Sequence, residues 1–346
     1  MSVVRKLLFP FSFLYALIVR VRNLMYDYGI FKSVTYDFPL ICVGNLSVGG
    51  TGKTPMIEYL IRLLKDEHKV ASLSRGYKRK TKGFLLADPD TRMEDIGDEP
   101  FQYHHKYNNI RVAVDADRVN GISELMKLQD PPEVILLDDA FQHRRVKAGL
   151  NIMLTVFDEL YTDDWMLPMG NLRDSRKESA RADIIIVTKC PADFSPEQKE
   201  RVLRKIKPEK GQKVFFTGIR YEKEVISGDR SLSFDSLTEK NFSLVTGIAR
   251  PSYLVKYLKS RGLKFEHLNF NDHHHFSDKE IDELNKKEMI ITTEKDYVRL
   301  SGRVDRLYYL PIKVDFLFGE EQEFTTLVAG FIKDKSGVEN PAFNSN

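Results

Sequence analysis

A glycine-rich segment between an apolar run and a helical pattern constrains the fold of this chain more than any other feature. Residues 47–54 read Ser-Val-Gly-Gly-Thr-Gly-Lys-Thr, the apolar run 40–43 precedes them, and apolar residues recur at helical spacing in 57–64. This is the context of a P-loop, in which backbone N–H groups bind phosphate, the lysine reaches the β- and γ-phosphates, and the threonine binds Mg²⁺. We therefore predict that the phosphates of ATP are bound by Ser47, Val48, Gly49, Gly50, Thr51, Gly52, Lys53 and Thr54.

Short apolar runs alternate with helical patterns along the chain, which is typical of βαβ units and a mostly parallel sheet. We expect strands at residues 40–43, 70–73, 110–114, 134–137, 152–156 and 184–187. Polar sequence in 221–241 interrupts the alternation, and a second, smaller α/β unit follows. Its predicted strands lie near residues 242–246, 265–268, 289–292 and 307–310, and its predicted final helix covers 320–332. A length of 346 residues agrees with about two domains.

Composition excludes several classes of protein. Hydrophobic residues make up 42% and charged residues 30%, which is ordinary for a globular chain and unlike disordered or collagen-like sequences. A net charge of +3 is too small to indicate a nucleic-acid-binding protein. The two cysteines, Cys42 and Cys190, show no metal-ligand spacing and agree with a reducing compartment.

The N-terminal region contains an uncharged run, residues 7–19, which follows Arg5 and Lys6. A helix of this length reaches about 20 Å, short of the roughly 30 Å hydrocarbon core of a bilayer. A cleaved signal peptide is one alternative, but no small-residue cleavage site follows the run. A helix packed on its own domain is the other. The aromatic residues in the run favour a helix that lies in the lipid interface, so we expect peripheral membrane contact.

A second motif supports the P-loop. Residues 133–139 form an apolar strand that ends in Asp138 and Asp139, the arrangement of a Walker B motif. Such acidic pairs also occur as helix caps, but beside a P-loop the favoured role is binding Mg²⁺, which prefers oxygen ligands. The lysine that partitioning ATPases carry just before the Gly-Gly is replaced by Val48, which argues against that class. A nucleotide switch or chaperone-type ATPase stays open as the alternative to an enzyme that transfers phosphate.

Two further motifs could act on an acceptor. Residues 97–100, Gly-Asp-Glu-Pro, place two carboxylates in a turn, and residues 272–276 read Asp-His-His-His-Phe. A histidine run can be a metal site or a solvated loop. The basic stretch 78–82 is either a solvated loop or a contact for anionic headgroups or a substrate phosphate.

Eight segments, in order along the chain, resemble the signature of the tetraacyldisaccharide 4'-kinase family, the lipid A kinases. They are Val43–Pro55, Leu73–Tyr77, Gly97–Pro100, Asp138–His143, Leu167–Asp174, Val245–Ala249, Asp272–His274 and Thr293–Asp296. The family commonly has Glu at the place of Asp174 and Gly at the place of Ala140. Eight ordered motifs are far more specific than a P-loop alone.

The resemblance implies a kinase that uses ATP and Mg²⁺ to phosphorylate the 4'-hydroxyl of a tetraacylated disaccharide 1-phosphate. It would act peripherally at the cytoplasmic face of the bacterial inner membrane, in contact with this lipid and the membrane surface, without nucleic acid or an obligatory protein partner. The implied catalytic residues are Asp98, assisted by His273, and Lys53. The implied metal ligands are Thr54, Asp138, Asp139 and Asp174, and the residues implied at the substrate or transition state are Arg75, Tyr77, Glu99, Arg173 and Asp272.

The implied fold is α/β with two domains. Residues 1–33 form a membrane-associating helix, and 34–225 form a P-loop kinase domain that is an α/β/α sandwich. Residues 226–346 form a second α/β domain, joined by a β-hairpin linker, that completes the active-site cleft. Asp98 and His273 would then come from different domains.

Overall fold

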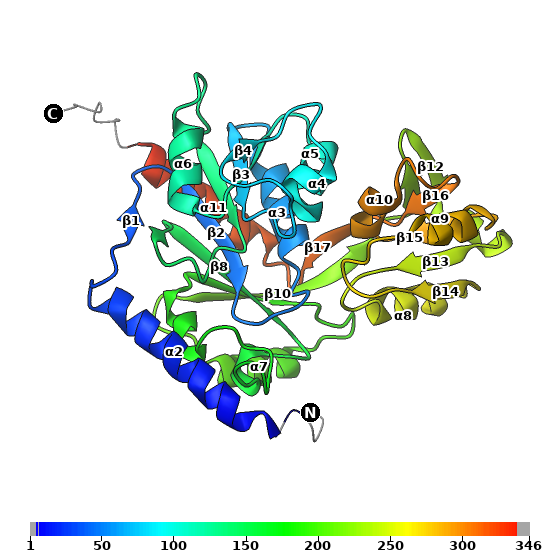
Figure 1. Cartoon of the computed structure of the whole chain (residues 1–346). Coiled ribbons are helices and arrows are strands. Elements are labelled where there is room, and N and C mark those ends of the chain that lie inside the picture. The colour runs from blue at the N-terminus through cyan, green and yellow to red at the C-terminus, as the bar shows by residue number, and fades with distance from the viewer. Residues whose placement is uncertain (1–4, 6, 338–346) are drawn as a thin grey trace.

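The computed structural model describes residues 5 and 7–337. The outermost parts of the predicted segments 1–33 and 226–346, residues 1–4, 6 and 338–346, lie outside the described residues. Figure 1 shows two α/β units side by side, and a helix, α2, that lies along the outside of the larger one.

The larger unit is built on a nine-stranded sheet within the described chain. All of its strands run parallel except one at each edge, where β17 pairs antiparallel with β10 and β4 pairs antiparallel with β5. The six strands predicted for this unit are present, whereas β4, β10 and β17 were not predicted. The spatial order is β17 (Ile312–Phe316), β10 (Lys213–Tyr221), β9 (Ile184–Thr188), β8 (Leu150–Val156), β2 (Leu40–Asn45), β6 (Val134–Asp138), β3 (Val70–Ser74), β5 (Arg111–Val114) and β4 (Leu85–Leu86).

Helices cover both faces of this sheet because its central strands are apolar on both sides. Leu40 and Cys42 of β2 pack in one buried cluster with α6 (Arg118–Met126) and α7 (Pro196–Ile206). Ile41 and Val43, which point to the opposite face, pack in a second buried cluster. That cluster includes side chains of α3 (Lys53–Leu64), α5 (Asp98–Lys106) and α11 (Glu321–Ser336). The unit is therefore an α/β/α sandwich. Shorter elements complete it: β1 (Val34–Thr35), α4 (Met93–Ile96), β7 (Val146–Lys147), η1 (Tyr161–Asp163) and η2 (Arg176–Arg181).

The smaller unit holds a six-stranded sheet that contains all four strands predicted there. Helix α8 (Ser252–Ser260) packs on one face, and α9 (Asp278–Asn285) and α10 (Glu294–Leu300) pack on the other. The short helix η3 (Phe234–Glu239) joins the first of these clusters. The spatial order is β12 (Arg230–Ser233), β11 (Glu224–Ser227), β16 (Leu307–Tyr309), β15 (Ile290–Thr292), β13 (Ser243–Thr246) and β14 (Glu266–Asn269).

The structure corrects the predicted domain boundary at 226–346. The chain leaves the larger unit on β10 and returns to it on β17, and these strands pair from Thr217↔Phe316 to Tyr221↔Ile312. Helix α11, which was assigned to the second unit, packs on the first sheet. The helical periodicity of 320–332 located this helix correctly but could not indicate which sheet its apolar face contacts. The predicted β-hairpin linker is thus an antiparallel pair of strands that are distant in the sequence.

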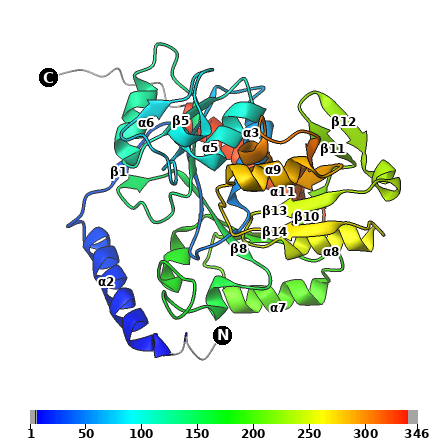
Figure 2. The same cartoon turned by 45° about the vertical axis from the view of Figure 1, so that its right-hand side comes forward.

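Helix α2 (Phe9–Asp27) is longer than the predicted run, and only one stripe of it is buried. Ser12, Val19 and Asn23 face the larger unit. The exposed face carries the large apolar side chains Phe9, Phe11, Phe13, Leu14, Leu17, Ile18, Val21 and Leu24. Both views place α2 at the periphery of the molecule (Figures 1 and 2). Among the described residues, no helix combines the length and apolar character needed to cross a bilayer.

The packing of α11 predicts a large stability cost for Phe324→Ala. Phe324 is fully buried, and its ring contacts those of Tyr59, Phe215 and Phe316. Replacing a buried phenylalanine by alanine costs about 3–5 kcal/mol. We expect a loss of this size in the free energy of urea unfolding, and almost none for Thr326→Ala on the exposed face of the same helix. An unchanged unfolding midpoint for Phe324→Ala would contradict the observed packing.

Candidate functional site

A cavity of about 810 Å³ is lined by residues of both units. The residues of the larger unit come mainly from loops at the carboxyl ends of β2, β3, β6 and β9, where the ligands of parallel sheets bind. Every predicted site residue except Asp174 lines this cavity. These residues are Ser47, Val48, Gly49, Gly50, Thr51, Gly52, Lys53, Thr54, Arg75, Tyr77, Asp98, Glu99, Asp138, Asp139, Arg173, Asp272 and His273.

The glycine-rich loop has the conformation that its sequence predicts. It leads from β2 into α3, whose first residue is Lys53. Gly52 has a φ of 93°, in the left-handed region that favours glycine, and this allows the sharp entry into the helix. The hydroxyl of Thr188 donates a hydrogen bond to the Thr51 carbonyl at 2.8 Å, and the side chain of Asn45 donates one to the Ser47 carbonyl at 2.7 Å. Side chains outside the loop therefore hold its backbone in place.

Positive side chains surround Asp139. Lys53 Nζ lies 3.6 Å from Asp139 Oδ1, and Arg173 donates a hydrogen bond to Asp139 Oδ2 at 3.0 Å. The other amino group of Arg173 contacts Asp139 Oδ1 and the side-chain oxygen of Asn45. Burial by itself raises the pKa of Asp139, but the charges of Lys53 and Arg173 outweigh it and hold this pKa well below its ordinary value. Asp139 is therefore a fixed negative charge that orients two cations.

Asp138 has the opposite electrostatic environment. Tyr103 donates a hydrogen bond to its Oδ2 at 3.0 Å, while its Oδ1 is buried and has no hydrogen-bond partner among the described residues. Burial, followed by the nearby charge of Glu99, raises the pKa of Asp138 to about 7. A buried carboxylate with a free oxygen and an excess of negative charge around it is a suitable ligand for a divalent cation.

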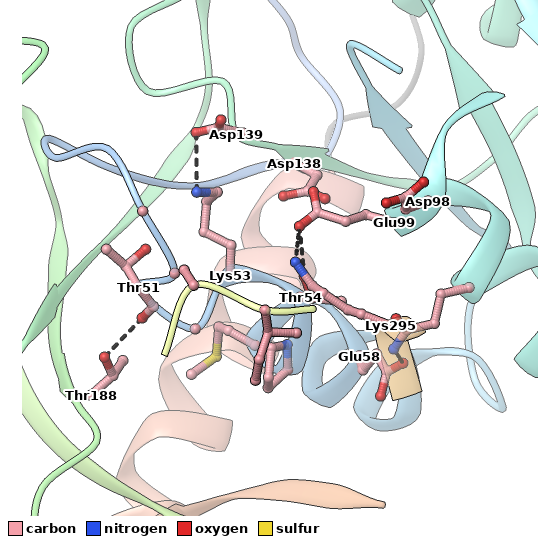
Figure 3. Close-up of a pocket in the computed structure, with 18 of the residues that line it drawn as sticks. Thr51, Lys53, Thr54, Glu58, Asp98, Glu99, Asp138, Asp139, Thr188 and Lys295 are labelled. Atoms are coloured by element: carbon pink, nitrogen blue, oxygen red, sulfur yellow. Dashed lines mark hydrogen bonds and ion pairs between the residues drawn. The ribbon is translucent and has the colours of Figure 1, made fainter. Parts of the chain in front are cut away.

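Glu99 connects the phosphate loop to the smaller unit. The Thr54 hydroxyl donates a hydrogen bond to Glu99 Oε1 at 3.0 Å, and Lys295 of α10 donates to the same oxygen. Burial raises the pKa of Glu99, but the charges of Lys295 and Lys53 lower it below its ordinary value overall. Figure 3 shows the Glu99 carboxylate directed toward Thr54 and the end of the Lys295 side chain, with Asp98 and Asp138 beside it.

Asp98 forms a second link between the units. Its Oδ2 lies 2.9 Å from His273 Nδ1 and accepts hydrogen bonds from Arg299 Nε at 2.8 Å and from another Arg299 nitrogen at 2.6 Å. Burial raises the pKa of Asp98, but the hydrogen bond from His273 and the charge of Arg299 lower it to about 2. Gly97, with φ of 90°, allows the turn before Asp98 to pack against Tyr77, because a Cβ there would lie 2.8 Å from the Tyr77 carbonyl oxygen.

The remaining predicted residues lie near this pair. The Tyr77 ring packs edge-on against the His273 ring with centroids 5.5 Å apart. Asp272 Oδ1 lies 4.0 Å from His273 Nε2. In the basic stretch 78–82, Arg79 donates to the Val114 carbonyl and Lys80 pairs with Glu94, so two of its cations contact the protein itself.

Asp174, one of the four predicted metal ligands, does not lie with the other three in the cavity. Its side chain is fully buried and accepts hydrogen bonds from the Asn23 side chain and the Ser175 N–H, each at 2.8 Å. It does not line the cavity. Asp174 directly follows Arg173 in the sequence, but the two side chains contact different parts of the protein: Arg173 reaches Asp139, whereas Asp174 contacts Asn23.

The charged residues in contact with the predicted site that were not predicted include Lys295, Arg299 and Lys189. Lys295 and Arg299 lie on α10, one helical turn apart, and contact Glu99 and Asp98. The segment Thr293–Asp296 is one of the eight family motifs and contains Lys295. Residues one helical turn apart lie on the same face, so the position of Arg299, one turn after Lys295, was the signal in the sequence for a second contact with the site. Lys189, after β9, donates a hydrogen bond to the Gly50 carbonyl at 2.6 Å, and burial lowers its pKa to about 8.

The fold and the site define a class of protein: a P-loop phosphotransferase with a carboxylate opposite its phosphate-binding loop. The family model for tetraacyldisaccharide-1-P 4'-kinase (LpxK) matches residues 4–333. The chain belongs to this family.

Individual relatives agree with this assignment. A tetraacyldisaccharide 4'-kinase of Flavobacterium johnsoniae is 50% identical over 96% of this chain and 99% of the relative. One from Bacteroides thetaiotaomicron is 40% identical over 96% of this chain and 94% of the relative. A crystal structure of LpxK from Aquifex aeolicus in complex with ATP superposes with a TM-score of 0.79 at 34% identity, covering 95% of this chain and 99% of that one.

The position of Lys53 predicts a large kinetic effect of Lys53→Met. Lys53 lies at the start of α3 beside Asp139, where it can neutralise charge on a transferring phosphoryl group. Losing one such group lowers kcat by about 10²–10³-fold. We expect this loss in ATP-dependent phosphoryl transfer, while Lys210→Met, at an exposed lysine that does not line the cavity, leaves the rate unchanged. Equal rates for the two variants would contradict the role of Lys53.

Proposed function

We propose that this protein transfers the γ-phosphoryl group of ATP to the 4'-hydroxyl of tetraacyldisaccharide 1-phosphate, a step in lipid A biosynthesis. The observation that carries the proposal is that Lys53 of the phosphate loop and the Asp98–His273 pair line one cavity. Family membership supports the choice of acceptor. A nucleotide switch or chaperone-type ATPase needs no carboxylate that faces the nucleotide site and is paired with a histidine of a second unit, so this alternative is not favoured.

Positioning and charge neutralisation account for most of the expected catalysis. The transition state of phosphoryl transfer is loose, and its charge is spread over the phosphoryl oxygens. Lys53 and Arg173, both held by Asp139, are fixed cations that can neutralise this charge without reorganising. The backbone N–H groups of the phosphate loop supply further donors.

Asp98 is the residue that we assign to the acceptor hydroxyl. With a pKa of about 2 it is ionised throughout the physiological range, and it is a weak base. A loose transition state needs little proton removal early, so a weak base is sufficient: Asp98 orients the hydroxyl and accepts its proton late. His273 and Arg299 contact only Oδ2, which leaves Oδ1 for the acceptor.

The residues around Asp138 fit a magnesium ion. Asp138 has a buried free oxygen, and Thr54 is the first-turn threonine of the helix after the phosphate loop. Among the described residues, no group of three or more His, Cys, Asp or Glu side chains converges on one point, so phosphate and water oxygens would have to complete the shell. Thr54 and Asp138 would hold the ion, while Asp139 holds Lys53 and Arg173, and a bound Mg²⁺ would supply further neutralisation of phosphate charge.

The other predicted site residues have roles that follow from their positions. Tyr77 and Asp272 lie next to His273, and Arg75 lines the same cavity; we assign these three residues to the acceptor. Glu99 holds Thr54 and Lys295 together and is therefore assigned a positioning role.

We also propose that α2 places the protein on the cytoplasmic face of the inner membrane. Its exposed face is almost entirely apolar and aromatic, and the lipid acceptor resides in a membrane. An enzyme with a membrane-resident acceptor needs contact with the membrane surface and not a spanning segment.

A direct assay tests the proposed function. Purified protein is incubated with labelled ATP, Mg²⁺ and the lipid disaccharide in mixed detergent micelles. We expect label transfer that depends on the lipid. Hydrolysis of ATP without transfer would overturn the proposal in favour of the ATPase alternative.

The low pKa of Asp98 predicts a pH-independent effect of Asp98→Asn. A carboxyl group whose pKa is depressed to about 2 stays charged at every pH above that value. General-base assistance is worth about 10²–10⁴-fold, and we expect a loss in this range with the same factor from pH 6 to pH 9. The control Glu94→Gln, on an exposed site, should not change the rate. A loss that disappears at pH 6 would show that Asp98 is not the group involved.

The apolar face of α2 predicts that charge on it abolishes membrane binding. Phe13 and Leu17 are exposed and one helical turn apart. We expect the double variant Phe13→Asp, Leu17→Asp to lose most of its sedimentation with anionic phospholipid vesicles, because burying charge in the apolar interface is unfavourable. Thr326→Asp, an exposed residue of α11, is the control. Unchanged sedimentation of the double variant would refute membrane contact through α2.

A further inference from the structure

The segment 169–174 lies between helix α2 and the phosphate loop and is bonded to both; we call it the bridging segment. On the side of the phosphate loop, the Arg173 N–H donates to the Leu46 carbonyl at 2.9 Å, and the Val48 N–H donates to the Asn171 carbonyl at 2.8 Å. These two backbone hydrogen bonds fix the position of the bridging segment relative to the beginning of the phosphate loop.

On the side of α2, the bridging segment is held by side chains of the helix. The Met169 N–H donates to the Ser12 hydroxyl oxygen at 2.8 Å, and the Tyr15 hydroxyl donates to the Arg173 carbonyl at 3.1 Å. Arg22 donates to the Gln142 carbonyl at 2.7 Å, and Gln142 in turn donates to the Asn45 carbonyl at the end of β2. The helix therefore contacts backbone groups immediately next to residues of the cavity.

The most deeply buried of these contacts is a polar pair, Asn23 and Asp174. Asn23 is 4% exposed and Asp174 is fully buried, and they are joined by a hydrogen bond of 2.8 Å from Asn23 Nδ2 to Asp174 Oδ1. Asn23 Oδ1 and Asp174 Oδ2 have no hydrogen-bond partner in the part of the chain that the structure describes. An apolar pair would pack a helix here at lower cost, so this polar pair contributes geometry rather than stability.

The Asn23–Asp174 pair bears on the position of the Arg173 side chain. Asp174 faces α2, while the preceding Arg173 faces the cavity and binds Asp139, beside Lys53. A shift of the bridging segment would move the Arg173 guanidinium away from the site of the transferring phosphoryl group. Misplacement by about 1 Å can cost about 10²-fold in rate.

We propose that Asn23 and Asp174 are positioning residues for phosphoryl transfer, through which helix α2 holds Arg173 against Asp139. This deepens the proposed function and rests on it. Asp174 then acts through the bridging segment rather than through a metal ion, and α2 has a role inside the enzyme that is separate from membrane contact.

A reciprocal exchange tests the proposal. Asn23→Asp places two buried carboxylates against each other, and we expect kcat to fall by about 10²-fold with the KM for ATP changed less than about threefold. Asp174→Asn keeps one amide hydrogen bond, and we expect a smaller loss. The double variant Asn23→Asp, Asp174→Asn restores an amide–carboxylate pair, and we expect kcat to return to within about threefold of the wild type.

Rates are measured with micellar lipid acceptor, so that membrane binding does not contribute, and unfolding midpoints are measured in parallel. Arg20→Gln, an exposed position of α2, is the matched control and should keep the full rate. The Mg²⁺ concentration for half-maximal rate should be equal in all variants. An exchange variant that is folded but no faster than Asn23→Asp, or an Asp174→Asn variant that needs much more Mg²⁺, overturns the proposal.

A second variant keeps the test valid if Asn23→Asp does not fold. Tyr15→Phe removes only the hydroxyl that donates to the Arg173 carbonyl, and we expect kcat to fall about threefold to tenfold with an unchanged KM for ATP. A Tyr15→Phe enzyme with the full kcat contradicts the proposal. The wild-type enzyme is assayed in parallel to distinguish failure of the positioning proposal from failure of the proposed function. If the wild type transfers no phosphate to the lipid, the proposed function itself is refuted.

Discussion

The register of two parallel strands determines where the chemistry of this protein takes place. Val43 of β2 pairs with Asp138 of β6, and the Asp139 N–H donates to the Val43 carbonyl. Both strands therefore end at the same edge of the sheet, one in the phosphate loop and the other in two carboxylates. A shift of two residues along the pairing would displace Asp139 relative to Lys53 by roughly 7 Å.

The two carboxylates differ in charge behaviour although they are neighbours in the sequence. Asp139 lies among cations and has a lowered pKa, whereas Asp138 lies beside Glu99 without a cation as hydrogen-bond partner and has a raised pKa. Their surroundings therefore give the two carboxylates different roles: Asp139 holds the cationic side chains Lys53 and Arg173, and Asp138 is suited to bind a metal ion. The smaller unit likewise affects carboxylate pKa values: Arg299 and Lys295 of α10 contact Asp98 and Glu99, and their charges lower the pKa of each.

Much of this could be predicted from the sequence, because the informative patterns are local. The phosphate loop, the strand before Asp138 and the apolar run in α2 each depend on residues within one short segment. The α/β class followed from the alternation of such segments. Contacts between distant segments carried no local pattern, so the placement of α11 was wrong and Arg299 was missed. Asp174 was misassigned because the sequence gives the order of side chains but not the direction in which each one points.

The return of the chain through β17 has a consequence for folding during synthesis. The smaller unit is an insertion within the larger one, since β10 precedes it and β17 and α11 follow it. Chains are synthesised from the N-terminus, and domains generally fold as units. The apolar surface that α11 covers stays open until residues 321–336, which follow the whole smaller unit, have left the ribosome. All segments of the smaller unit emerge before β17 and α11. The smaller unit can therefore complete its fold before the larger unit, although the larger unit begins to emerge first.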